Sequence, residues 1–110
     1  TQFYDSTGAL RDMLQSHILQ TLALTAMEQP KDLTPEGVRA AKIKVLEEIR
    51  PIPVNELEKH AFRAQYKAGE INGEQVLGYL EELGDNTSVV ETYAALKLFI
   101  DNPRWKGVPF

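Results

Sequence analysis

The feature that most constrains the fold of this chain is a change of hydrophobic period between its two halves. From Leu10 to Leu22 the apolar residues recur at the spacing of a helix that buries one face. In residues 61–66 the apolar and polar side chains instead alternate, as they do in a half-buried strand. Helices followed by strands predict an α+β fold, in which two main helices precede part of an antiparallel sheet.

The first half has clear signals for where its helices start and stop. Capping side chains precede a first helix, which we expect from about Thr7 to Met27 and which Pro30 follows. A second helix is expected from Thr34 to about Arg50, with a capping threonine, a proline in its first turn and an acidic residue next to it. Past Ile18 the first helix is apolar on nearly all sides, which predicts burial against several neighbours.

The second half is expected to contain strands and loops. A first strand is predicted around residues 62–66, a mostly irregular segment at 67–78, and a short helical turn near 76–82. A second strand is predicted at 91–100 and a third beginning at 105–110, with Tyr93 and Trp105 in the core. A fragment of a sheet has unpaired edges, which a longer chain would cover.

The composition of the chain argues against several classes of function. A chain of 110 residues has room for one modest core, and its net charge of −4 argues against a nucleic-acid partner. Without cysteine there are no disulfides and no thiolate chemistry. The longest apolar stretch, residues 18–27, is too short to span a membrane, and no secretory leader opens the chain, so we expect a cytoplasmic protein. A start without methionine and an apolar end at Phe110 suggest that both ends were trimmed.

Few residues could perform acid–base chemistry near neutral pH, because the only histidines are His17 and His60. At about 100° per residue, His17 would lie roughly 60° from Gln20 and about 140° from Asp12, beside the polar face of its helix. It is either a buried, hydrogen-bonded structural histidine or a general base. Asp12 either complements the helix dipole or binds ligand hydroxyls. We expect His60 to be exposed and without a function.

Metal and nucleotide sites are not expected within this sequence. Neither histidine has a second ligand at helical spacing that looks committed to a metal, so no metal site is predicted. The chain also has no glycine-rich phosphate loop and no dinucleotide fingerprint after a strand.

Several motifs occur together in one order and spacing. They are FYDSTGALRDMLQSHILQTLALTAMEQP, VRAAKIKVLEEIRPI, FRAQYKAG, GYLEEL, ETYAALKLFIDN and RWKGVPF. In these motifs the chain resembles the glucose-6-phosphate dehydrogenases over essentially all of its 110 residues. Two positions depart from the family pattern: Ser16 stands where asparagine is usual beside the histidine, and Pro103 stands where tryptophan is common.

The resemblance implies a role for each candidate residue. His17 would be the general base that removes the proton from the C1 hydroxyl of glucose 6-phosphate, and Asp12 would bind the sugar. The implied reaction transfers a hydride from C1 to NADP, with NAD possible, and gives 6-phosphogluconolactone in the first step of the pentose phosphate pathway. An imidazole suits the proton transfer, because it changes charge near neutral pH.

The resemblance also implies that the chain is one part of a larger enzyme. Residues 1–110 would form part of the substrate-binding C-terminal domain, while the dinucleotide-binding domain and the phosphate-binding HYLGKE segment would lie outside them. We therefore expect the isolated chain to be inactive and the full-length enzyme to be a homo-oligomer. The alternative is a non-catalytic sugar-phosphate-binding or oligomerisation module built on the same fold.

Overall fold

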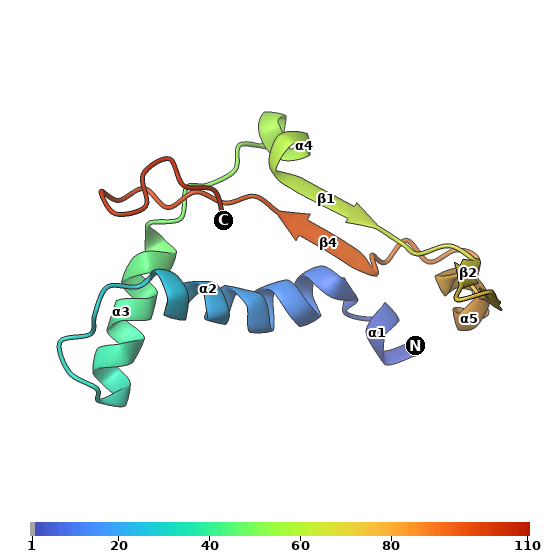
Figure 1. Cartoon of the computed structure of the whole chain (residues 1–110), viewed down its shortest axis with the longest axis horizontal. Coiled ribbons are helices and arrows are strands. Elements are labelled where there is room, and N and C mark those ends of the chain that lie inside the picture. The colour runs from blue at the N-terminus through green and yellow to red at the C-terminus, as the bar shows by residue number, and fades with distance from the viewer. Residues whose placement is uncertain (1) are drawn as a thin grey trace.

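A computed structural model describes residues 2–110, which begin with one long helical run (Figure 1). A short helix α1 (Gln2–Asp5) and a turn lead to residues 8–26, which are helical throughout. This run contains a π-helical segment η1 (Leu10–Ile18), followed by the α-helix α2 (Leu19–Ala26). The predicted first helix is therefore confirmed in extent, but nine of its residues have π-helical geometry, which the apolar spacing does not reveal.

The second helix, α3 (Pro35–Glu47), begins with the predicted cap. The Thr34 hydroxyl accepts a hydrogen bond from the Gly37 N–H at 3.1 Å, which satisfies one of the free amides of the first turn. α3 packs against α2, and the small residues of α2 let the two helices meet around a compact core. The core consists of four fully buried residues: Ala23, Ala26, Val45 and Ile100.

Two separate antiparallel strand pairs follow. Strand β1 (Ala61–Ala64) pairs with β4 (Tyr93–Leu96), with Ala61 opposite Leu96. Strands β2 (Gly69–Ile71) and β3 (Glu74–Val76) form a tight hairpin in the segment that was expected to be mostly irregular. Asn72 and Gly73 both have positive φ, 54° and 86°, which is the geometry of a type I′ turn. The irregular-loop prediction for residues 67–78 is therefore wrong at its centre.

The remaining elements are short. They are a 3₁₀ turn η2 (Val54–Glu56), helix α4 (Leu57–His60), and helix α5 (Tyr79–Leu83) close to the predicted helical turn. The predicted second strand is shorter than expected, and the predicted third strand at 105–110 is wrong. Residues 105–107 of that segment form a turn in which Gly107 has a φ of 80°, and the bridge between Phe99 and Pro109 is isolated.

In Figure 1 the β1–β4 ribbon runs above the long helix, α3 descends steeply from one end, and the β2–β3 hairpin with α5 lies beyond the other end. The molecule is elongated, with extents of 52 × 34 × 28 Å. Burial on several sides of the first helix is not observed, since Ile18 and Leu24 are about half exposed. Tyr93, predicted to be in the core, is 57% exposed, whereas Trp105 packs against the core and donates its indole N–H to the Ala26 carbonyl at 2.8 Å. Among residues 2–110 we find no helix of the length and apolar character that crossing a bilayer requires.

Candidate functional site

Asp12 and His17 both lie on the π-helical segment, and this geometry changes their relationship. In a π-helix each N–H bonds to the carbonyl five residues earlier, as the Leu19 N–H does to Leu14. Because a π-helix has more residues per turn than an α-helix, residues five apart lie closer together around the helix axis than they would in an α-helix. Asp12 and His17 are five apart, so the sequence-based expectation of about 140° between them is wrong, because it assumed α-helical geometry.

A side chain supports the π-helical spacing immediately before the histidine. The Ser16 hydroxyl donates a hydrogen bond to the Arg11 carbonyl, five residues back, at 3.0 Å. Farther along the helix the Thr21 and Thr25 hydroxyls bond four residues back, to His17 and Thr21 respectively, as is usual in an α-helix. The π-helical segment ends at Ile18, and the side-chain hydrogen bonds of the α-helix that follows span four residues.

The His17 side chain is exposed to solvent. Within residues 2–110 its imidazole forms no hydrogen bond, and its main-chain carbonyl accepts one from Thr21 at 3.3 Å. A structural histidine normally satisfies its ring nitrogens inside the protein, so the part of the chain described here does not give His17 that role. The exposed side chain is accessible to a molecule that approaches the helix from solvent.

Asp12 is half-buried and lies toward the aromatic residues near the start of the chain. Burial raises the pKa of Tyr4, and the nearby negative charges of Glu91 and Asp12 raise it further. The Tyr4 hydroxyl donates to the Glu91 carbonyl at 3.4 Å. Asp12 thus belongs to a polar region where α1, the first turn of the long helix and the start of β4 meet.

An aromatic cluster holds α5 against the start of the chain. Tyr79 is 2% exposed, and its hydroxyl donates to Asp5 at 2.9 Å. Burial, and then this hydrogen bond, raise the pKa of Tyr79 to about 12. The Ser88 hydroxyl also donates to Asp5, and the rings of Tyr4 and Tyr66 pack edge-on against Tyr79. The cluster holds Tyr4 in place, and Tyr4 lies near enough to Asp12 to be affected by its charge.

The second histidine has a structural role. His60 was expected to be exposed, but 18% of its side chain is accessible, and its Nδ1 lies 3.1 Å from the Lys97 carbonyl. Its ring packs edge-on against Phe99, with a centroid separation of 6.1 Å. His60 therefore connects α4 to the end of β4, and it does not share the helix face of His17.

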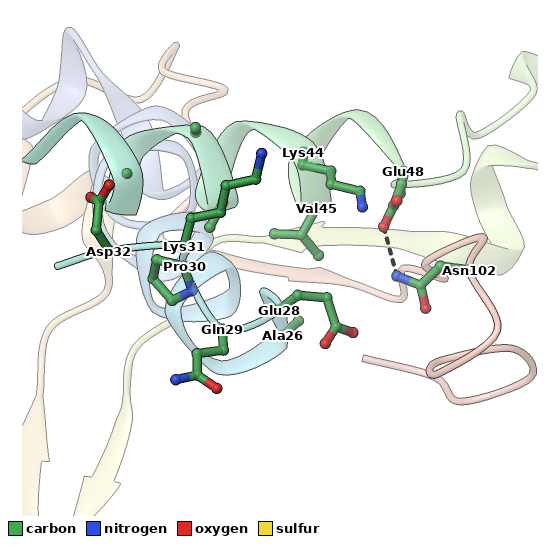
Figure 2. A pocket seen from close by; sticks show the side chains of 13 residues that line it. Ala26, Glu28, Gln29, Pro30, Lys31, Asp32, Lys44, Val45, Glu48 and Asn102 are labelled. Atoms are coloured by element: carbon green, nitrogen blue, oxygen red, sulfur yellow. Dashed lines mark hydrogen bonds between the residues drawn. The ribbon is translucent and has the colours of Figure 1, made fainter. Parts of the chain in front are cut away.

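The hollow drawn in Figure 2 is a different region from the His17 helix face. It has a volume of about 340 Å³ and lies between α3 and the segment that follows α2. Glu28, Lys31 and Lys44 contribute charges of both signs, and Glu48 accepts a hydrogen bond from Asn102 at 2.6 Å. Neither Asp12 nor His17 lines this hollow.

The start of helix α5 is already bonded to a carboxylate of the chain itself. Gly78 lies between strand β3 and helix α5, where a pyrophosphate would need free amides at a helix start. The Gly78 N–H instead donates to the carboxylate of Glu81 at 2.8 Å, so this helix start already has an anion. Over the same described residues, no group of three histidine or carboxylate side chains could hold a metal ion.

Comparison with known proteins places this geometry in a family. The family model described as "Glucose-6-phosphate dehydrogenase, C-terminal domain" matches residues 1–110. Glucose-6-phosphate 1-dehydrogenase of Gluconobacter oxydans is 54% identical over 108 residues, which are 98% of this chain and 22% of that protein. The corresponding protein of Bacillus subtilis is 50% identical over 112 residues, covering 99% of this chain and 22% of its own length.

Solved structures agree in fold. A glucose-6-phosphate dehydrogenase in complex with its substrate glucose 6-phosphate superimposes with a TM-score of 0.80 at 38% identity, over 97% of this chain and 21% of that one. A Mycobacterium avium glucose-6-phosphate 1-dehydrogenase superimposes with a TM-score of 0.78 at 38% identity, over 98% and 21%. The chain thus spans about a fifth of the length of these relatives, and it belongs to the glucose-6-phosphate dehydrogenase family.

Proposed function

We propose that this chain is the part of a glucose-6-phosphate dehydrogenase that supplies the catalytic base and one sugar ligand. In this proposal His17 removes the proton from the C1 hydroxyl of glucose 6-phosphate, and Asp12 accepts hydrogen bonds from the sugar. NADP, with NAD as the alternative, would accept the hydride from C1 and would be held by residues outside this chain. The observation that supports the proposal is the π-helical segment, whose wider turn brings an exposed histidine and a half-buried aspartate closer together around the helix axis than α-helical geometry would.

The chemistry of the two residues fits the role that the proposal gives to each. Removing the hydroxyl proton while the hydride leaves lets the C1 carbonyl form without accumulation of positive charge on the sugar. A carboxylate that accepts hydroxyl protons on the same face would fix the sugar so that C1 faces the imidazole. A general base must come within hydrogen-bond distance of its proton, which an exposed imidazole allows.

The wider setting follows from the same proposal. The complete enzyme would act in the cytoplasm as a homo-oligomer, and residues 1–110 would be part of its substrate-binding C-terminal domain. The chain alone would have no turnover, because the hydride acceptor and the phosphate group of the substrate would lack binding residues.

The test uses the longer enzyme encoded around this segment, assayed by reduction of NADP with glucose 6-phosphate. His17→Asn should lower kcat by roughly 10²- to 10⁴-fold, the usual contribution of a general base, without changing the melting temperature. The matched control is His60→Gln, which alters the only other histidine of these 110 residues and should keep kcat near that of the wild type. Near-normal turnover of the His17 variant would defeat the assignment. Tight glucose 6-phosphate binding by a protein without turnover would favour the non-catalytic module instead.

A further inference from the structure

Glu91, just before strand β4, contacts the first turn of the helix that carries Asp12 and His17. Its side-chain Oε1 accepts the Leu10 N–H at 2.9 Å, and its own carbonyl accepts the Ala9 N–H at 3.1 Å. The first amides of a helix have no partner within the helix. Here one residue, 81 positions away from Leu10 in the sequence, satisfies two of them in succession.

The contact is close because a glycine precedes it. Gly8 is buried and has a φ of 77°, a conformation that side-chain-bearing residues rarely adopt. A Cβ at this position would lie 2.7 Å from Oε1 of Glu91 and 3.1 Å from the Val90 side chain. The absence of a side chain at Gly8 therefore lets Glu91 reach the helix.

Charge strengthens the same contact. The hydrogen bond from the Leu10 N–H lowers the pKa of Glu91, and the nearby positive charges of Arg63 and Arg11 lower it further. Glu91 is thus ionised at neutral pH, and a carboxylate at the start of a helix is stabilised by the helix dipole. Hydrogen bonds to an ionised acceptor are also shorter and stronger than neutral ones.

The opposite end of the long helix is held independently of Glu91. Ala23 and Ala26 of α2 are buried against Val45 of α3 and against Ile100. The helix therefore has two fixed points, one at Leu10 and one in α2. Asp12 lies two residues from the first point, whereas His17 lies between the two.

We propose that Glu91 is a positioning residue, which sets the rotation of the first helical turn so that Asp12 meets the sugar of glucose 6-phosphate. This inference rests on the proposed function. If Glu91 is lost, the helix start can shift while the core at α2 still holds the other end. The shift is then larger at Asp12 than at His17, so substrate binding should suffer more than proton transfer.

The test measures steady-state kinetics of the longer enzyme with Glu91→Ala, Glu91→Gln and, as a matched control on an exposed carboxylate, Glu74→Ala. Glu91→Ala should raise KM for glucose 6-phosphate about tenfold, the effect of losing one hydrogen bond to a charged acceptor, with kcat within about twofold and KM for NADP unchanged. Glu91→Gln should recover most of this loss, because its amide oxygen can still accept the Leu10 N–H. The control should match the wild type.

Gly8→Ala perturbs the same contact from the helix side and should raise the same KM, which keeps the inference testable if Glu91→Ala does not fold. If the wild type is active but Glu91→Ala and Gly8→Ala both leave KM for glucose 6-phosphate unchanged, the inference is overturned and the proposed function is not. The inference would also be overturned if KM rose equally for both substrates and kcat fell by the same factor, because that pattern indicates general destabilisation. A wild type without dehydrogenase activity would overturn the proposed function, and this inference with it.

Discussion

The isolated 110-residue chain should not unfold cooperatively, and its surface area shows why. Its accessible surface is 8357 Å², whereas a compact monomer of 12.4 kDa is expected to expose about 6,100 Å². The excess is therefore roughly 2,200 Å². Its radius of gyration is 18.0 Å, against about 13 Å for a compact domain of this length. Both quantities describe an elongated molecule that has unusually little interior.

The excess surface corresponds to a hydrophobic free energy of folding that the isolated chain does not gain. If a little over half of it is apolar, roughly 1,200 Å² of apolar surface is exposed that a compact domain would bury. At about 25 cal/mol per Å² this is about 30 kcal/mol of hydrophobic stabilisation, an upper estimate because unfolded chains also bury some surface. The net stability of a typical domain is only about 5–15 kcal/mol. The small core around Ile100 cannot compensate for a deficit of this size.

The measurement is urea unfolding of the isolated chain, followed by near-ultraviolet circular dichroism and by the fluorescence of Trp105. We expect a broad transition, weak near-ultraviolet signal, and binding of an apolar dye, as in a chain that retains helices without fixed packing. Sedimentation at the same concentration shows whether the species is monomeric. A monomer with coincident, sharp transitions and a free energy of unfolding of about 5 kcal/mol or more would refute the reasoning.

Two further predictions concern stability in the longer protein. The pKa of Tyr79 is raised by burial, and then by its bond to Asp5, from 10.0 to about 12, so its stabilising effect is complete below pH 10 and lost as the pH rises toward 12. Tyr79→Phe should therefore lower the free energy of unfolding below pH 10. Between pH 10 and 12 the free energy of unfolding of this variant should fall less steeply than that of the wild type. Parallel curves of stability against pH for the two proteins would contradict this. Ile100→Ala should cost about 2–5 kcal/mol in urea unfolding, because Ile100 is 1% exposed in the core. The control Val108→Ala, at a 40% exposed side chain, should cost about 0.5 kcal/mol or less, and equal losses would contradict the assignment of the core.

Local sequence signals predicted the helices better than the strands. The cap at Thr34 and the proline after it determine where α3 begins, and both act through neighbouring residues. The β2–β3 hairpin was also predictable in principle, because Asn72-Gly73 is a strong type I′ signal between two short strands. The third predicted strand failed for another reason. The Asn102 side chain accepts the Trp105 N–H at 2.9 Å and helps to stabilise a turn there.

The candidate site shows a sharper limit of prediction from sequence. His17 and Asp12 could be selected because the chain has few acid–base groups and because their surroundings resemble a known family. Glu91 could not be selected, since its bond to Leu10 joins residues 81 positions apart and no local pattern records it. Its side chain alone, in a stretch predicted to be a strand, gives no sign of a helix contact.

The relative orientation of Asp12 and His17 could not be predicted from the sequence, for a physical reason. Apolar spacing distinguishes a helix from a strand, but it does not distinguish α-helical from π-helical hydrogen bonding over nine residues. The Ser16 hydroxyl, bonded to the carbonyl of Arg11 five residues back, accompanies the wider turn. The relative orientation of Asp12 and His17 therefore depends on the hydrogen-bond pattern of the helix as well as on the positions of the two residues in the sequence.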